Sequence, residues 1–334
     1  MTDSFNSLWD NLPPEARDDR LGLIYQLSLS HRVAVNTAVW LTDRVDIPEI
    51  VTQGGTWGPL LCSNSIDDIG KSFKESGFGY SYKNLANIIP LAMVDDLLVI
   101  NQCGPKSMKM NTIINSKIEL KKLEFHLPDA SKVGKCNFMH IGKPSESCPG
   151  MKVHGQSAIE VKEAMYLGDI IRSDGKNISN VKSRVQKGIG IAAEITSLLK
   201  SISFGKRHFE IAVILREARL INCILTNAEV WYSLGNTEIA NLEKVDTMFL
   251  RKVLSVPPSV SKESLYLELG LIPISVIIKS RRVMYLHYLA NLQKDEMLYK
   301  VFIAQWQYPG KDDWTEIVRA DLLDLGLTRK LDYL

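Results

Sequence analysis

The sequence has few cysteines and no long apolar segment, and these absences exclude several classes of protein. Five cysteines are scattered through 334 residues. An odd number at such spacing argues against a disulfide framework and for a reducing compartment. The longest uncharged run, Ile50–Ile66, contains six Gly, Ser or Asn residues and a proline, so it does not predict a membrane span. No basic start or apolar stretch of a signal peptide is present. We expect an intracellular protein, nuclear or cytoplasmic, with no membrane partner.

A strong net charge is also missing, because the formal charge is only +2. The 45% hydrophobic and 23% charged composition excludes a disordered or low-complexity chain. The charge is nevertheless uneven: residues 1–100 carry 7 Lys or Arg and 13 Asp or Glu, whereas residues 101–210 carry 18 and 10. This distribution predicts a cation site beside a surface for a polyanion. Chance fluctuation in a neutral protein gives the same pattern.

The hydrophobic pattern changes from mixed to helical near Gly175. Before it, we expect a helix over residues 13–30, strands over 31–51 and a helix over 107–123. Beyond it, apolar residues recur every three or four positions and predict further helices, over 178–202, 209–231, 237–256 and 274–292. The fold class we expect is therefore α+β, with an all-α part after Gly175.

Two adjacent carboxylates, Asp95 and Asp96, lie between two apolar runs of strand length within residues 86–100. We expect this pair at the tip of a β-hairpin. Carboxylates among apolar residues are costly to desolvate unless a cation or hydrogen bonds compensate. Mg²⁺, a hard ion that prefers oxygen ligands, would do so, and polymerases use pairs of such ions. The alternative is an exposed acidic turn.

A Gly-rich loop about 40 residues earlier brings a known family into view. Val51–Leu61 (VTQGGTWGPLL) resembles the QG-x-x-x-GP-L block of reverse transcriptases, and Met93–Leu98 (MVDDLL) resembles their aromatic-x-Asp-Asp block. Further along, Lys132 with Lys135 and then Tyr166-Leu167-Gly168 resemble the lysine and primer-contact blocks, in the same order. Among reverse transcriptases, the chain resembles most the polymerase proteins of non-LTR retrotransposons. Residues 263–286 resemble the helical region that follows the polymerase blocks in those proteins.

This resemblance implies an incomplete right-hand polymerase palm over residues 1–175, a helical thumb over 176–260 and a C-terminal helical extension over 261–334. The family reaction is RNA-templated, Mg²⁺-dependent DNA synthesis from deoxynucleotides, with an RNA template, a DNA primer or an RNA–DNA hybrid as partners. In this chain the resemblance makes Asp95 and Asp96 the catalytic metal ligands.

The resemblance also implies roles for other residues, and for basic ones the alternative is an ordinary solvated helix face. Nucleotide and template contacts fall on Gln53, Gly54, Gly55, Lys132 and Lys135. Primer contacts fall on Tyr166, Leu167 and Gly168. Contacts with the nucleic-acid backbone, which give salt-dependent and sequence-blind affinity, fall on Lys182, Arg184, Lys187, Lys206 and Arg207.

One departure from the family concerns its first catalytic carboxylate, which lies five residues before the Phe that Phe5 matches. That position precedes Met1, and Asp3 would have to replace a ligand about 10 Å away along a strand. The fingers also have no counterpart. We therefore expect impaired catalysis with nucleic-acid binding retained. Two alternatives are an active polymerase whose missing segment is absent only from the gene model, and a non-enzymatic nucleic-acid-binding or interaction protein.

Two weaker patterns in the sequence do not predict a functional site. Cys136, His140, Cys148 and His154 match no regular zinc-finger spacing, so we expect no zinc. Three further histidines and an aromatic stripe are interpreted as structural: His126, His208 and His287 as ordinary core or surface residues, and Met284, Tyr285, Leu286 and Tyr288 as helix-packing core.

Overall fold

The computed structural model has α+β architecture and divides into two compact units. The first comprises Met1–Tyr80, Ile88–Phe138 and Ser145–Ile159, and the second comprises Ser81–Asn87, Met139–Pro144 and Glu160–Leu334. The structure describes residues 31–33, 45–47, 70–72, 75–76, 79–88, 90–93, 96–102, 105–120, 136–142, 150–153, 155–232, 234–310 and 313–327. Within these ranges, none of the helices combines the length and apolar character needed to cross a bilayer.

The described strands form two-stranded antiparallel or bridged pairs, most of them local hairpins. The hairpin of β5 (Leu91–Met93) and β6 (Asp96–Leu98) pairs Met93 with Asp96 and Leu91 with Leu98. Four other pairs are β1 (His31–Val33) with β2 (Val45–Ile47), β3 (Tyr80–Tyr82) with β4 (Ala86–Ile88), β7 (Asn137–Phe138) with β10 (Ile159–Glu160), and β8 (Lys152–Val153) with β9 (Gln156–Ser157).

Helix α4 (Pro105–Leu120) packs on β8 within the first unit. Met110 and Ile114, four residues apart, are buried on one side of the helix. The Asn115 side chain donates from Nδ2 to the carbonyl oxygen of Lys152 at 2.7 Å. One apolar stripe and one polar contact therefore hold this helix in place.

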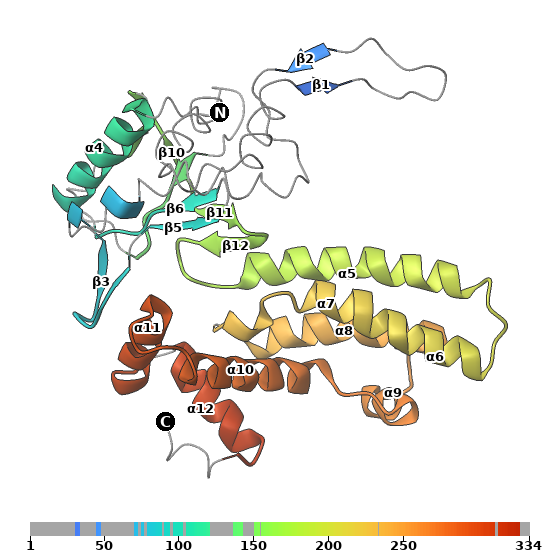
Figure 1. The fold of residues 1–334 in the computed structure, drawn as a ribbon. Coiled ribbons are helices and arrows are strands. Elements are labelled where there is room, and N and C mark those ends of the chain that lie inside the picture. Colours follow the sequence, from blue (N-terminus) through green and yellow to red (C-terminus); the bar gives the residue numbers. More distant parts are fainter. Residues whose placement is uncertain are drawn as a thin grey trace, which may run out of the picture. The chain divides into compact units, whose positions relative to one another are not determined.

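From Glu163 onward, the second unit forms a hairpin followed by helices (Figure 1). The hairpin pairs β11 (Glu163–Tyr166) with β12 (Asp169–Arg172). The helices are α5 (Ile178–Leu199), α6 (Lys206–Leu215), the π-helix η2 (Arg216–Ile221), α7 (Asn222–Ile224), the 3-10 helix η3 (Ala228–Val230), α8 (Asn236–Leu254), α9 (Lys262–Leu269), α10 (Ile274–Ala290), α11 (Met297–Gln307) and α12 (Trp314–Asp324).

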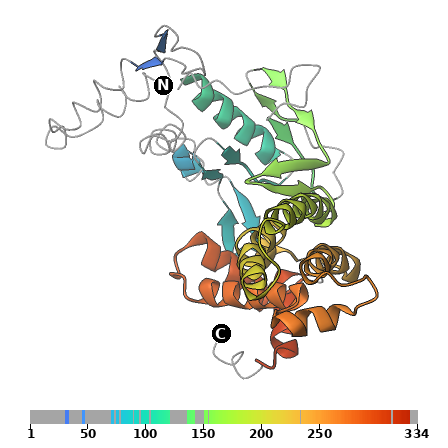
Figure 2. The same cartoon turned by 90° about the vertical axis from the view of Figure 1, so that its right-hand side faces the viewer.

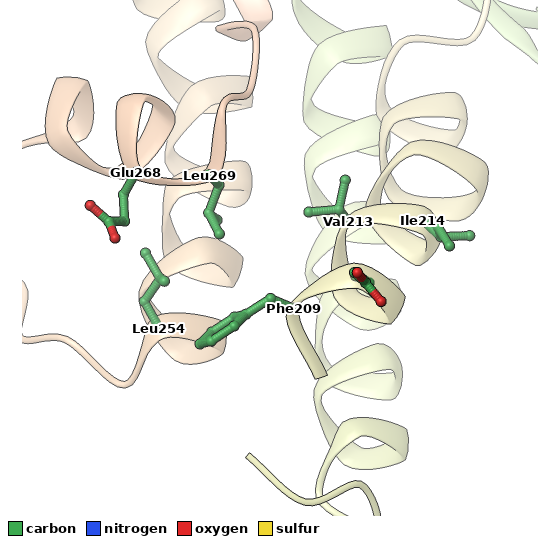
Figure 3. A pocket seen from close by; sticks show the side chains of 7 residues that line it. Phe209, Val213, Ile214, Leu254, Glu268 and Leu269 are labelled. Carbon is green, nitrogen blue, oxygen red and sulfur yellow. The ribbon is translucent and has the colours of Figure 1, made fainter. Parts of the chain in front are cut away.

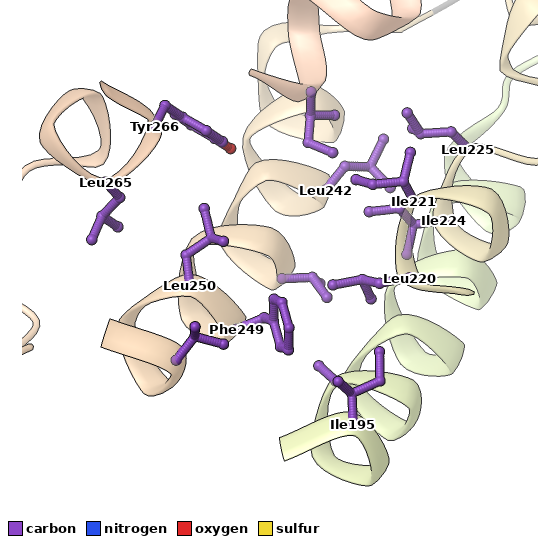
Figure 4. Close-up of a cluster of buried hydrophobic side chains, with 14 of the residues drawn as sticks. Ile195, Leu220, Ile221, Ile224, Leu225, Leu242, Phe249, Leu250, Leu265 and Tyr266 are labelled. Atoms are coloured by element: carbon purple, nitrogen blue, oxygen red, sulfur yellow. The ribbon is translucent and has the colours of Figure 1, made fainter. Parts of the chain in front are cut away.

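The core of this unit lies where α5 packs against α8, α7 and η2, seen from two directions in Figures 1 and 2. Figure 4 shows Ile195 of α5, Leu220 of η2 and Phe249 of α8 converging, and each of these side chains is fully buried. Gly188 lets α5 approach closely: a Cβ there would clash with Cγ2 of Ile224 and lie 3.2 Å from Cγ1 of Val245.

A second apolar cluster joins α10, α11 and α12 around Leu286, Phe302 and Val318. Beside it, a buried ion pair links α10 to α12, because Nη1 of Arg282 lies 3.0 Å from Oδ2 of Asp321. Trp314 donates from Nε1 to the carbonyl oxygen of Glu229 at 2.7 Å, which ties α12 to η3. The C-terminal helices are thus anchored by polar contacts as well as by packing.

A buried charge network crosses the main core. Arg216 and Asp246 are both fully buried, with Nη2 of the arginine 2.7 Å from Oδ2 of the aspartate. Tyr266 donates its hydroxyl to the same oxygen at 3.0 Å. Burial and the neighbouring Asp246 charge raise the pKa of Tyr266 far above its ordinary value. Although burial opposes the charged form, the hydrogen bonds that Arg216 donates to Asp246 and the charge of that aspartate raise the pKa of Arg216, so its guanidinium stays charged.

Of the expected helices, the one over 107–123 agrees as far as residue 120, and those beyond Gly175 agree except over 209–231; the one over 13–30 lies outside the described residues. The predicted helix over 209–231 is interrupted, because α6 passes into the π-helix η2 and then a 3-10 turn. The prediction that the stripe at 284–288 is packing core is wrong for two of its members. Met284 is 69% exposed and Tyr288 is 52% exposed, since successive helical residues point about 100° apart.

Replacing Gly188 by alanine should destabilise the protein by about 1–3 kcal/mol, because the added methyl group overpacks the contact with α7 and α8. The matched control is Gly190→Ala in the same helix, where nothing lies within 4 Å of the new Cβ. That change should stabilise by about 0.5–1 kcal/mol through helix propensity. Urea unfolding of the two variants measures both effects, and equal stability of the two would contradict the packing described.

Candidate nucleic-acid interface

The hairpin of β11 and β12 ends in a turn with unusual backbone geometry. Tyr166 pairs with Asp169, leaving Leu167 and Gly168 as the two turn residues. Both have positive φ, +47° and +83°, as a type I′ turn requires. Asn and Gly are the usual residues there, whereas a leucine in this region costs about 1–2 kcal/mol. The Leu167 side chain is 45% exposed.

One carboxylate fixes this turn to the helices. Oδ1 of Asp169 accepts hydrogen bonds from Nη2 of Arg184 at 2.9 Å and from Nδ2 of Asn180 at 3.0 Å. Its Oδ2 accepts a bond from Asn227, in the turn between α7 and η3. Arg184 also donates to the carbonyl oxygen of Gly168 at 3.1 Å. The Asp169 side chain is therefore the point at which hairpin, α5 and a distant turn meet.

The open end of the hairpin has its own anchor. Nη1 of Arg172 lies 2.6 Å from Oε1 of Glu163, and both side chains bond to the hydroxyl of Ser179 in the first turn of α5. Arg172 also donates to both oxygens of Asp174 at 2.9 Å. These bonds, with one from the amide of Lys176, hold the pKa of Asp174 well below its ordinary value.

The segment between hairpin and α5 is held by Tyr232, whose hydroxyl donates to the carbonyl oxygen of Gly175. Gly175 has φ +71°, which favours glycine, and a Cβ there would meet that same hydroxyl. Partial burial, together with the charges of Asp174 and Asp313, raises the pKa of Tyr232. The hairpin thus reaches α5 through a fixed connection.

Four of the five expected backbone-binding residues are exposed on the first two helices of this unit. Lys182 and Lys187 lie on α5, and Lys206 and Arg207 begin α6. Lys182 and Lys187 are five positions apart, which places them about 140° apart around the helix. They therefore flank the exposed side of α5 rather than form one line along it.

Arg184 differs from these four residues and corrects the sequence-based expectation. Its side chain is only 8% exposed and its guanidinium is occupied by Asp169 and Gly168. It lies two positions after Lys182, so it points to the opposite side of the helix. Arg184 holds the hairpin, and we leave it out of the surface offered to a phosphate backbone.

The remaining expected site residues are only partly described. Asp96 begins β6 beside the turn of the β5–β6 hairpin, where the pattern predicts the second carboxylate, and its exposure also fits the alternative of an acidic turn. Its neighbour and the expected nucleotide and template contacts lie outside the described residues, and these are Asp95, Gln53, Gly54, Gly55, Lys132 and Lys135.

No metal centre emerges from the part of the chain that the structure describes, which contains no group of three or more His, Cys, Asp or Glu side chains able to hold an ion. Asp96 alone does not make a magnesium site, and we derive no step through one. In the cysteine–histidine pattern, His140 contacts Glu160, with Nδ1 and Oε1 2.8 Å apart, and burial raises the pKa of Cys136. Cys148 and His154 lie outside the described residues.

Sequence reasoning missed the contacts of Asp169 with Asn180, Arg184 and Asn227, which we call the clamp. Asn180 and Arg184 are four positions apart, which places both on one side of a helix. The pair Gly168-Asp169 signals a turn. Neither signal connects the two, because Asp169 and Asn227 are 58 residues apart and meet only in the folded unit.

Comparisons with known proteins add no neighbour: no family model, no curated protein and no solved structure matches this chain.

Replacing Asp169 by asparagine should destabilise the protein by about 1–3 kcal/mol, because Arg184 then stays buried without a counter-ion. Amide hydrogen exchange should accelerate most in residues 163–172. Asp324→Asn is the matched control, since it removes a 61% exposed partner of Lys279 and should cost under about 1 kcal/mol. Unchanged exchange in the hairpin of the Asp169 variant would contradict the clamp.

Proposed function

We propose that this chain binds a primer–template hybrid as a reverse-transcriptase-like protein of a non-LTR retrotransposon. The sequence blocks that resemble this family motivate the proposal. The observation that carries it is the hairpin tip, where an exposed leucine is held in a strained conformation by the bonds to Asp169. In this proposal residues 1–175 correspond to the palm, 176–260 to the thumb and 261–334 to the extension.

Backbone strain at an exposed apolar residue supports a binding role for the tip. A strained conformation persists only where the surrounding structure determines it, and such residues gather at binding sites. Arg184 donates hydrogen bonds to Gly168 and Asp169 and so fixes the turn to α5. The Leu167 side chain is therefore presented to solvent in one orientation. An apolar group so placed suits contact with the sugar and base at the end of a primer, which Tyr166 and Gly168 flank.

The exposed basic residues of α5 and α6 support the same function by a different mechanism. Lys182, Lys187, Lys206 and Arg207 would neutralise phosphates and release counterions, which gives affinity independent of base sequence. Lys206 has a weak partner in Glu210 at 3.8 Å, and its side chain is 92% exposed, so it remains available. A copying protein needs this kind of contact, because it reads a hybrid by shape and backbone.

Leu167→Asn separates binding from folding. Asparagine adopts positive φ readily, so the variant should be as stable as the parent or up to about 1 kcal/mol more stable. Its affinity for an RNA–DNA hybrid should fall about tenfold, because the apolar contact is lost. Fluorescence anisotropy with a labelled hybrid measures the affinity, and chemical unfolding measures the stability.

The control for this variant is Leu323→Asn, which changes a 60% exposed leucine on α12 and should leave affinity unchanged. In the same assay, Lys182→Gln and Lys187→Gln should each lower the slope of log affinity against log salt by about 0.7–0.9. A Leu167 variant that binds like the parent, or a salt slope near zero, would count against the proposed function.

Catalysis is a second candidate, supported by the position of Asp96 beside the turn of an antiparallel hairpin. The test is primer extension on an RNA template with Mg²⁺ and deoxynucleotides. We expect little or no incorporation beside intact hybrid binding. Incorporation by the parent chain that disappears in both Asp95→Asn and Asp96→Asn would overturn this expectation and make the protein an active polymerase.

A further inference from the structure

The second unit has an open apolar groove, whose chemistry differs from that of the basic residues of α5. It has a volume of about 530 Å³ and is bounded by α6, α9 and the end of α8. Figure 3 shows Phe209, Val213 and Ile214 on the α6 side and Leu269 on the α9 side, with Leu254 between them. Ile214 is 63% exposed, so the groove presents uncovered apolar surface.

Two carboxylates give this groove its charge. Glu210 from α6 and Glu268 from α9 are both exposed lining residues, one on each wall. The only ion pair described for either is the exposed contact of Glu210 with Lys206 at 3.8 Å, which screens it weakly. Among the residues that the structure describes, none of those lining the groove is basic. Its apolar floor is therefore framed by negative charge.

This combination selects among classes of occupant. A nucleic-acid backbone would bring phosphates next to two carboxylates, so the groove is unsuited to it. An amphipathic helix with a basic flank matches both features, because its apolar residues fill the groove while its lysines or arginines meet the carboxylates. Phe209 and Val213 are one helical turn apart, and the groove runs between two helices, which is the arrangement of helix-in-groove recognition.

We propose that the groove between α6 and α9 docks an amphipathic, basic helix of a protein partner. The partner helix presents apolar side chains at i, i+3, i+4 and i+7, and its cations pair with Glu210 and Glu268. This surface adjoins Lys206 and Arg207 at the start of α6, so Lys182 and Lys187 on α5 are the residues whose variants test the proposed nucleic-acid contacts separately.

The probe is a fluorescein-labelled peptide of about 14 residues, with leucine at the four helical positions named above and lysine elsewhere. It is titrated with the full chain by fluorescence anisotropy. Two comparison peptides accompany it: a scrambled peptide of the same composition, and one with glutamate in place of lysine. We expect the probe to bind at least about tenfold more tightly than either.

Two pairs of variants locate the binding. Ile214→Ser should weaken binding of the probe about tenfold, whereas Leu323→Ser, which changes a similarly exposed residue on α12, should leave affinity unchanged. Glu268→Gln should weaken binding about threefold in low salt and less in high salt, whereas Glu263→Gln on the same helix, outside the groove, should have no effect. Thermal melting of each variant checks that the fold is intact.

Four outcomes would overturn the proposal. Equal binding of the probe and the scrambled peptide would mean that charge attraction alone accounts for the affinity. An unchanged Ile214→Ser affinity would place the peptide elsewhere. Displacement of the probe by an oligonucleotide would make the groove part of a nucleic-acid surface. Self-association of the chain without peptide, abolished by Ile214→Ser in sedimentation, would make a second copy the occupant.

Discussion

The Asp169 carboxylate is the contact on which the arrangement of the candidate interface depends. It accepts bonds from α5 and from the turn that follows α7, while its own backbone closes the β11–β12 hairpin. Hydrogen bonds to an ionised group are stronger than neutral ones and are directional. The tip of the hairpin therefore has one orientation relative to α5. This arrangement uses Arg184 as an internal ligand, which removes one cation from the surface and gives the tip a fixed position.

Buried arginine–aspartate pairs recur elsewhere in the helical unit. Arg216 with Asp246 joins η2 to α8, and Arg282 with Asp321 joins α10 to α12. Each pair joins elements that are far apart in the sequence. Apolar packing is not directional and tolerates sliding of one helix along another. We interpret the buried pairs as devices that select one register, at a desolvation cost that the packing around them offsets.

Sequence patterns predicted those features that depend on local periodicity, and failed where distant residues decide the outcome. The apolar repeat beyond Gly175 located α5, α8 and α10 to within a few residues. The expectation that Arg184 contacts a nucleic-acid backbone was wrong. It came from the family resemblance, which assigns roles without reference to the face of the helix on which a residue lies. Positive φ at Leu167 was beyond prediction, since leucine disfavours it.

The two candidate surfaces differ in how far the sequence could reveal them. The hairpin contacts follow from a contiguous block, Tyr166 to Gly168, that resembles a known motif. The groove is assembled from single turns of three helices, so no contiguous segment carries its signature. Charge gives a partial signal, because the glutamates of α6 and α9 stand out only once the helices are adjacent. Expectations for Asp95 and the Gly-rich loop stay predictions.

The π-helix at Arg216–Ile221 keeps buried positions that recur every four residues on one side of the helix. From α6 to α7, buried residues recur every four positions, at Ala212, Arg216, Leu220 and Ile224, with Ile221 buried beside them. In an α-helix four residues turn about 400°, so each step drifts by about 40°. A π-helical turn holds more residues and rotates the chain back. These four positions consequently stay aligned with the core, whereas in an unbroken α-helix the last of them would lie about 120° from the first.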